Sequence, residues 1–284
     1  MKNIKTFLLL FFLSLFFMII GNLIAGRSGM LFALLFSLVT NFISYWYSDK
    51  IILKMYNAKE VDQSHDLYKI VSKLVSKADL PMPKVYIIEQ NQANAFATGR
   101  NPENAAVACT VGLLNTLDIN ELSGVIGHEL AHINNRDILI GTVAASIAGA
   151  IAYLANIARW SAFLGTNRRS SREENNNTFI LILTAIFAPL AAGIIQMSIS
   201  RTREYKADEL GAKYCGNPLY LANALKKLEL GAYRNKMKAT EATSHMFIIN
   251  PFTGLKNINL FSTHPSTQDR ILRLEKMAKV QYDY

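Results

Sequence analysis

The sequence predicts a mainly α-helical integral membrane protein with a small β-sheet and four transmembrane or membrane-associated helices. Of its 284 residues, 51% are hydrophobic, which is high for a water-soluble protein. The apolar residues gather in four segments of membrane-spanning length, at 6–24, 30–47, 138–157 and 179–199. Two short strand-like stretches lie between the second and third segments. The chain therefore divides into membrane segments at 1–50 and 138–199 and two polar halves of one domain at 51–137 and 200–284.

The two leading apolar segments are each long enough to cross a bilayer as helices, and glycines at 26 and 29 predict a tight turn between them. Aromatic residues at 45–47, followed by Lys50 and Lys54, are typical of a membrane interface. A cleaved signal peptide is the competing interpretation of 6–24. No A-x-A-like site follows this segment and a second span comes at once, so the sequence favours a retained span.

From about residue 61 the chain becomes polar and mixed. Residues 64–78 are predicted to form an amphipathic helix that ends before Pro81 and Pro83. Short strands are predicted at 85–88 and 105–111, with the small, turn-prone segment 94–99 between them.

The motif with the clearest chemistry is His-Glu-Leu-Ala-His at 128–132. Asp118 and Glu121 form a capping-box-like start for the helix that carries it. The apolar stripe of this helix is Leu122, Val125, Ile126, Leu130 and Ile133.

Residues four apart share one helix face, so His128 and His132 can bind one metal ion with Glu129 beside them. Two histidines and a third protein ligand leave a position on zinc for water, and Glu129 can take a proton from that water. A metzincin would place a glycine and a third histidine downstream, where Asn135 and Ile138 stand instead. The third ligand must therefore come from elsewhere.

The apolar segments 138–157 and 179–199 carry small residues at four-residue spacing, which favours close packing of membrane helices. Buried helices of a soluble core are the alternative interpretation of both. The polar segment 166–178 between them has no packing pattern and is predicted to be a solvated loop.

Glu204 and Asp208 follow the fourth apolar segment and share a helix face. A carboxylate from a second helix is what a two-histidine zinc site needs, and a further acid one turn on could accept the outer N–H of a ligating histidine. The alternative is a solvated, salt-bridged face beside Arg201, Arg203 and Lys206.

The net charge of +9 does not indicate a nucleic-acid partner, because basic residues are spread along the chain and several flank the apolar segments. Cys109 and Cys215 have no CxxC spacing, and we interpret them as small buried residues rather than as a disulfide or a metal site.

The segments HELAHINNRD at 128–137 and SRTREYKAD at 200–208 together resemble the HtpX family of membrane-bound zinc metalloproteases, which is related to the CAAX prenyl-protein endopeptidases. Segments 94–99, 244–251 and 263–266 also resemble family segments, in the same order. The resemblance implies a gluzincin-type protease domain that binds one zinc ion. It implies that Glu204 is the third ligand and that Asp208 supports the site from behind the ligands.

The resemblance also implies that His264 lies near the active site and helps to stabilise the oxyanion. Ser266 stands where the family typically has a second proline, and by spacing alone His264 is a loop histidine. The strand that begins with Asn94, Ala95 and Phe96 is implied to be a sheet edge that pairs with an extended substrate.

A shared zinc ion requires 51–137 and 200–284 to lie on one side of the bilayer, so the chain crosses twice or not at all between 138 and 199. Lys2 and Lys5 favour a cytoplasmic N-terminus, and two leading spans return the chain to the cytoplasm. Arginines in the loop 166–178 would then lie outside, against the charge rule, and a non-spanning hairpin is the alternative.

The resemblance, taken together with this topology, implies a zinc endopeptidase of a bacterial cytoplasmic (inner) membrane. The resemblance also implies that it acts from the cytoplasmic side on misfolded or damaged membrane proteins, in quality control and stress response. Its partners would be polypeptide substrates and the lipid bilayer. A CAAX-type processing protease is one alternative, which a larger set of spans enclosing a chamber would favour. A non-catalytic metal transporter or sensor is another, but the four apolar segments contain no histidine or acidic residue that could form a metal path.

Overall fold

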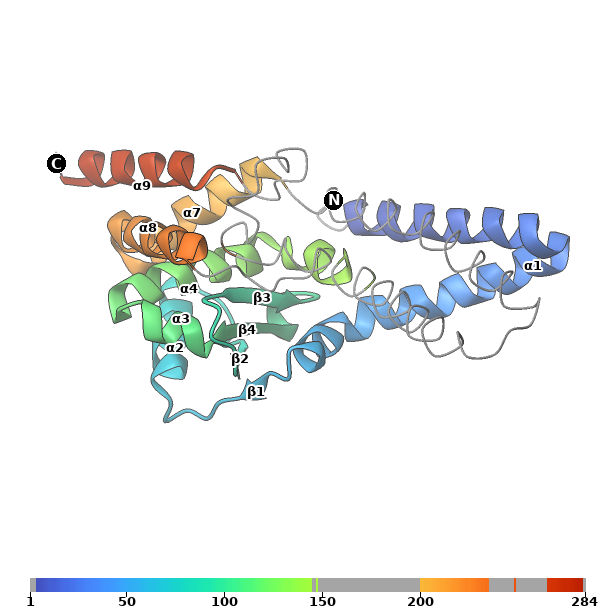
Figure 1. Ribbon diagram of the computed structural model, residues 1–284, viewed down its shortest axis with the longest axis horizontal. Coiled ribbons are helices and arrows are strands. Elements are labelled where there is room, and N and C mark those ends of the chain that lie inside the picture. The colour runs from blue at the N-terminus through green and yellow to red at the C-terminus, as the bar shows by residue number, and fades with distance from the viewer. Residues whose placement is uncertain (1–3, 145–146, 148–199, 235–247, 249–264, 283–284) are drawn as a thin grey trace.

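The computed structural model describes residues 4–144, 147, 200–234, 248 and 265–282. Figure 1 shows a long kinked helix, α1, that runs out from the remainder of the protein and returns to it. The remaining described elements form a small sheet packed against helices, and the metal motif lies within that part. The observed class is mainly helical with a small mixed sheet, as predicted.

Helix α1 (Ile4–Met55) consists of two helical arms that meet at a kink. Ala25 and Gly26 leave helical geometry there, and Gly26 takes a φ of 58°, which glycine adopts without strain. The predicted turn at 26–29 is thus shorter than expected, and the second arm continues past residue 50 to Met55. Asn41 Nδ2 donates to Ser14 Oγ at 2.8 Å and so ties the two arms together.

Within the described residues, one helix has the length and apolar composition of a membrane span. Ala25–Met55 is long and apolar enough to cross a bilayer, with a mean hydropathy of 1.5 and only 6% of its most apolar stretch buried. Thr6–Ile19 is a shorter apolar helix. Most of the predicted segment 138–157 lies outside the described residues, as do all of 179–199 and the loop 166–178, so the expected count of four membrane helices remains a prediction.

Within the described part of the chain, the sheet has four strands in the order β1-β2-β4-β3. β2 (Lys84–Ile88) and β4 (Ala105–Thr110) are parallel and form its centre. β1 (Lys59–Glu60) and β3 (Ala95–Gly99) are antiparallel to their neighbours and lie at the two edges. Among the described residues β3 is therefore an edge strand, as predicted for segment 94–99, whereas the short β1 was not predicted.

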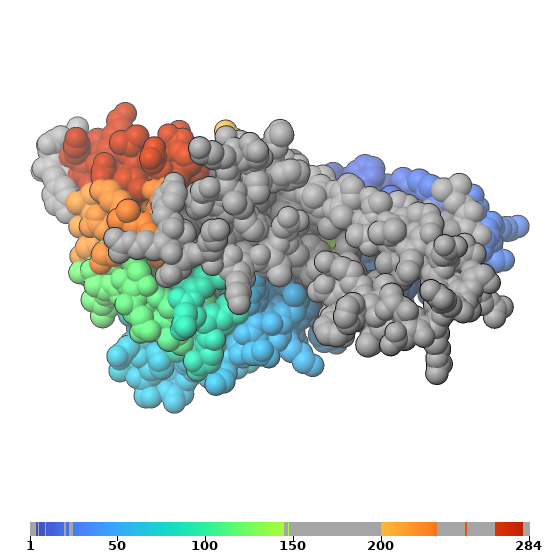
Figure 2. Space-filling model, in the orientation of Figure 1, coloured from blue at the N-terminus to red at the C-terminus, as the bar shows by residue number. Residues whose placement is uncertain are grey.

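The metal motif lies on α4 (Ile119–Asn135), which packs against β3, β4 and several other helices. α2 (Asp66–Ala78) follows the N-cap His65, so the helix begins two residues later than the predicted start at 64, and it packs into the same hydrophobic core as α4. In Figure 2, α9 (Thr267–Tyr282) and α8 (Pro218–Arg234) lie one above the other, with α4 below them. The other described elements are η1 (Pro102–Asn104), α3 (Val111–Thr116) and α7 (Arg201–Cys215).

The chain that follows α4 connects the sheet and its helices to α1. Residues 138–144 are helical, and Leu139, Ile140 and Val143 pack against Leu13 of the first arm in a small apolar cluster. A second cluster joins Ile52 of the second arm to the sheet through Phe96 and Ala108. The two arms of α1 are thereby fixed relative to β3 and β4.

Candidate metal centre

The helix that carries the motif begins as the sequence predicts. Asp118 Oδ1 accepts hydrogen bonds from the backbone N–H groups of Asn120 (2.9 Å) and Glu121 (3.0 Å), and Glu121 Oε2 accepts from the N–H of Asp118 (3.0 Å). This reciprocal capping starts α4 at a defined residue and so sets which side chains face inward. All members of the predicted apolar stripe are buried: Leu122, Val125, Ile126, Leu130 and Ile133.

Close approach of two helix backbones brings the second half of the site to the first. A Cβ added at Gly127 of α4 would lie 2.7 Å from the carbonyl oxygen of Gly211 in α7. A Cβ added at Gly211 would lie 2.6 Å from the backbone nitrogen of His128. Only glycines allow this contact, and it places Glu204, two turns before Gly211 on α7, beside the histidines of α4.

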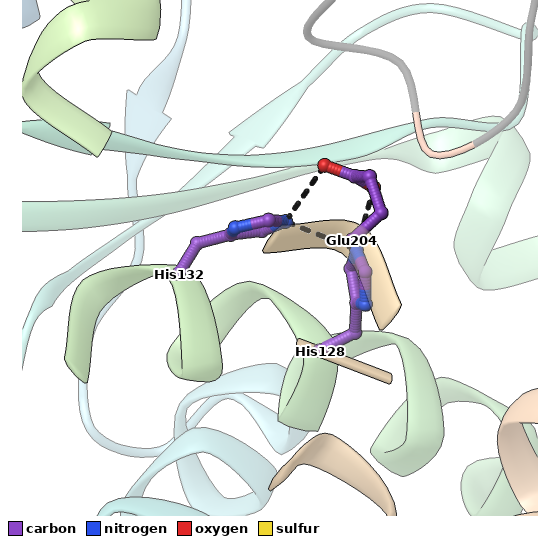
Figure 3. A group of neighbouring side chains, drawn as sticks. All are labelled: His128, His132 and Glu204. Carbon is purple, nitrogen blue, oxygen red and sulfur yellow. Dashed lines mark hydrogen bonds and ion pairs between the residues drawn. The ribbon is translucent and has the colours of Figure 1, made fainter. Parts of the chain in front are cut away.

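The side chains of His128, His132 and Glu204 converge on one point (Figure 3). The two Nε2 atoms are 3.1 Å apart, and the Glu204 carboxylate oxygens lie 3.7 Å from His128 Nε2 and 3.6 Å from His132 Nε2. Glu204 is only 8% exposed, so it does not form the solvated face that was the alternative for this segment. Two imidazoles and a carboxylate are a donor set that suits a divalent transition metal such as zinc.

Each histidine has a carboxylate behind it. Asp208 Oδ1 lies 2.9 Å from His128 Nδ1, where the sequence placed it, and Asp137 Oδ1 lies 3.1 Å from His132 Nδ1. Such a carboxylate holds the proton on Nδ1 and leaves Nε2 free to bind a metal. The role of Asp137 was not predicted. The turn that places it is made by Arg136, which ends α4 in the left-handed conformation.

Arg270 of α9 is a component that the sequence interpretation missed. It is 1% exposed, and its guanidinium makes two hydrogen bonds to Asp208, Nε to Oδ2 at 2.9 Å and a terminal nitrogen to Oδ1 at 2.7 Å. Its other terminal nitrogen donates to the carbonyl of Ile248 at 2.8 Å. The sequence signal for a buried Arg270 was its place beside the buried apolar positions of its helix, which are Ile271, Leu274 and Ala278.

These charges shift the protonation of the site. Burial opposes ionisation of Asp208, but Arg270 outweighs it and holds the pKa of Asp208 below its usual range. Burial and the positive charge of Arg270 lower the pKa of His128. Burial also disfavours the charged form of His132, yet the carboxylates of Asp137 and Glu204 prevail and raise the pKa of His132 to about 10.

Glu129 lies between the metal-ligand cluster and the sheet edge. Its Oε2 accepts a hydrogen bond from the backbone N–H of Ala97 in β3 at 2.8 Å, and the residue is 6% exposed. Burial raises the pKa of Glu129 to about 7. The edge strand and the carboxylate are thus held together in a fixed geometry.

The side chains of the predicted substrate-binding strand point away from this edge. Phe96 is buried against Tyr56 of the chain that follows α1, with ring centroids 5.5 Å apart. Asn94 is buried and its Oδ1 accepts from the N–H of Ile248 at 3.3 Å, and Ala95 is fully buried. Any contact of this strand with a substrate would therefore be made by its backbone. His264 lies outside the described residues, so its predicted role remains a prediction.

Replacing Arg270 with methionine is expected to destabilise the fold by about 3–5 kcal/mol, because the buried Asp208 carboxylate would lose its cation. The loss of orientation at His128 should also weaken metal binding about 10–100-fold. Thermal denaturation and competition with a metal chelator would measure the two effects. The control is Arg273→Met on the same helix, where the exposed guanidinium covers the ring of Tyr205. Equal effects of the two substitutions would contradict a specific role for Arg270.

Comparison with known proteins gives concordant results. The model of peptidase family M48 matches residues 62–278. A protein named "Protease HtpX homolog" from Desulforapulum autotrophicum is 53% identical over 275 residues, which cover 96% of this chain and 89% of that protein. "Protease HtpX" from Legionella pneumophila (strain Corby) is 50% identical over 279 residues, covering 97% and 99%. The crystal structure of S. mikatae Ste24p matches with a TM-score of 0.51 at 18% identity. The match covers 96% of this chain but only 65% of Ste24p, and it shows likeness of fold.

Proposed function

The chain belongs to peptidase family M48 and is a metalloprotease, and from this we propose that it is a membrane-bound zinc endopeptidase. In this proposal His128, His132 and Glu204 hold one zinc ion, and Asp208 and Asp137 orient the two histidines. The observation that carries the proposal is the position of Glu129. The sequence places it beside a metal ligand, and its carboxylate is bonded to the edge strand where a peptide could lie.

Zinc held by these three residues would supply Lewis acidity that makes water more acidic and polarises a peptide carbonyl. Glu129 would take the proton of the attacking water and then deliver it to the nitrogen of the leaving amine. The hydrogen bond from Ala97 keeps the carboxylate of Glu129 aimed at the same place during both transfers. His264 is proposed, from the family resemblance, to stabilise the oxyanion.

β3 is proposed to bind substrate by adding the peptide as a further strand. Its outer edge faces Glu129 through Ala97, whereas the side chains of Ala95 and Phe96 belong to the core. Backbone pairing makes little use of substrate side chains, which suits an enzyme that acts on many polypeptides. We propose that these are misfolded or damaged membrane proteins and that the enzyme serves protein quality control and the stress response.

Two other functions were open from the sequence. A CAAX-type processing protease is expected to enclose its substrate within more membrane helices than the four predicted here. A non-catalytic metal-binding protein would have no need of a buried carboxylate beside the ligands, and Glu129 is such a carboxylate. Membership of a peptidase family also favours catalysis.

The surface of α1 supports attachment to a membrane. Large apolar side chains are exposed along both arms, among them Phe7, Phe32 and Leu35, each at 63% or more. Near the end of the second arm, Arg100 covers the ring of Trp46 at 4.3 Å and Lys50 lies 5.3 Å from the ring centre of Tyr47. Aromatic residues paired with cations are typical of the lipid headgroup level. We propose that both arms cross a bacterial inner membrane and that the metal centre faces the cytoplasm.

This orientation makes a labelling prediction in a background with Cys109 and Cys215 replaced by alanine. A single cysteine at Ser28, beside the kink of α1, should react with a membrane-impermeant thiol reagent in intact cells. Cysteines at the exposed Glu103 and Lys276, on the two halves of the metalloprotease domain, should resist until the cells are permeabilised. Labelling of only one of the latter two would contradict a shared metal site, whereas labelling of both with protection of Ser28 would reverse the orientation alone.

The enzymatic proposal is tested on detergent-purified protein by measuring bound zinc and casein cleavage for the wild type and the Glu129→Gln variant in parallel. Zinc in both proteins with cleavage by the wild type alone would support it. Cleavage that persists after zinc is removed by a chelator would overturn it.

A further inference from the structure

The outer edge of β3 is occupied at one end by a side chain from the helix after α4. In an antiparallel pair, the N–H and C=O of alternate residues point to the same side of a strand. Asn94 accepts from Thr110 across the sheet, so residues 94, 96 and 98 are directed to β4. Ala97 and Gly99 donate in the opposite direction, to Glu129 Oε2 at 2.8 Å and to Thr142 Oγ1 at 3.3 Å. The outward positions are therefore Ala95, Ala97 and Gly99.

Thr142 is held firmly in this place. Its hydroxyl donates to the carbonyl of Ile138 at 2.8 Å and lies 3.1 Å from Thr98 Oγ1. Thr142 is 1% exposed and Thr98 is fully buried. Residues on either side of Thr142 pack against the first arm of α1. Figure 1 shows that the arrowhead of β3, its Gly99 end, is directed toward α1.

We propose that Thr142 is a positioning residue that closes the substrate-binding edge at Gly99. The inference rests on the proposed function, since it concerns how the peptide pairs with β3. Because the outward N–H of Gly99 is already bonded, a substrate strand cannot pair beyond Ala97 in that direction. The N–H of Ala97 is bonded to Glu129, so the outward carbonyl of Ala97 and the outward backbone groups of Ala95 remain as the pairing positions.

The closure makes substrate recognition one-sided. Ala97 is the strand residue bonded to Glu129, so the bond to be cleaved lies beside Ala97. Strand pairing then extends from the cleaved bond toward Ala95 only. On the other side, the helix that carries Thr142 replaces the substrate as the partner of β3. The hydrogen bond from Gly99 to Thr142 also keeps β3 in register, so that the Ala97 N–H stays at Glu129.

The first test compares Thr142→Val with Thr142→Ser in the full-length, detergent-purified protein. Valine keeps the shape and removes the hydroxyl, so the end of β3 loses its anchor and a buried N–H loses its acceptor. We expect KM for a peptide substrate to rise about tenfold, with bound zinc unchanged and kcat little changed, and we expect serine to restore KM. Thr116→Val, which removes a hydroxyl bonded within α3, is the matched control and should leave KM unchanged. A Thr142→Val protein with a lower melting temperature and lower kcat at unchanged KM would show a structural role alone and overturn the proposal.

The second test uses the wild-type protein and a peptide cleaved at one bond, shortened stepwise from either end. Loss of kcat/KM should be steep when residues are removed on one side of the bond and slight on the other. An equal loss on both sides would overturn the one-sided edge while leaving the protease assignment intact. Absence of any zinc-dependent cleavage would instead refute the proposed function, and the inference with it.

Discussion

Glu129→Gln is expected to lower peptide hydrolysis by about 10²–10⁴-fold or more while zinc remains bound. The amide of glutamine has the shape of the carboxylate, and its oxygen can still accept the N–H of Ala97 that Glu129 Oε2 accepts at 2.8 Å. It cannot take a proton from water or return one to a leaving amine. Metal content by mass spectrometry and cleavage of casein by purified protein would measure the two quantities separately.

The control for this variant is Glu209→Gln, which changes an exposed carboxylate of α7 that pairs with Lys213. It should retain both zinc and activity. Near-normal cleavage by Glu129→Gln protein that is free of wild-type enzyme would contradict the assignment of Glu129 as the proton carrier. Loss of zinc together with activity would mean that the substitution disturbs the neighbouring ligands.

Glu204→Ala is expected to abolish zinc binding and hydrolysis together. The two histidines alone are a weak site at neutral pH, because protons compete for their nitrogens. In the present geometry the Glu204 carboxylate lies within 4 Å of both Nε2 atoms and supplies the only negative charge among the three proposed ligands. Removing Glu204 leaves two imidazoles, which carry no negative charge to balance that of a bound cation.

The Asp208→Ala variant distinguishes a residue that binds the metal from one that orients a metal-binding histidine. This variant should retain most of its zinc and lose about 10–100-fold in affinity or activity, as is usual when a partner behind a ligand is removed. The two variants are compared by zinc titration, with circular dichroism to establish that each is folded. Equal zinc affinity of Glu204→Ala and the wild type would show that another acidic residue is the ligand.

The two arms of α1 and the amphipathic α2 were predictable because their patterns are local. Apolar length marks the arms, and periodicity marks the helix. The boundaries were less well predicted. The end of the second arm at Met55 and the short strand β1 depend on packing against the sheet, where Ile52 and Phe96 belong to one buried cluster. β1 pairs with β2 across more than 20 residues of chain, and a two-residue strand has no pattern of its own.

The parts of the metal centre that depend on helix geometry could be predicted from the residue spacing. The four-residue spacing places His128 and His132 on one face, the same spacing relates Glu204 to Asp208, and the capping box starts α4 at a defined residue. These relations hold in any helix, because 3.6 residues per turn fixes which side chains are neighbours.

The distant groups that complete the site could be identified only from the packing of the folded chain. The contact of Gly127 with Gly211 sets the distance between α4 and α7, Arg270 reaches Asp208 from the last helix, and Thr142 reaches Gly99 from the helix after the motif. Each of these contacts joins residues more than 40 positions apart, and none repeats with a period that a sequence could display. They follow from how helices and strands pack, because a buried charge or backbone N–H must find its partner wherever the fold brings one within reach.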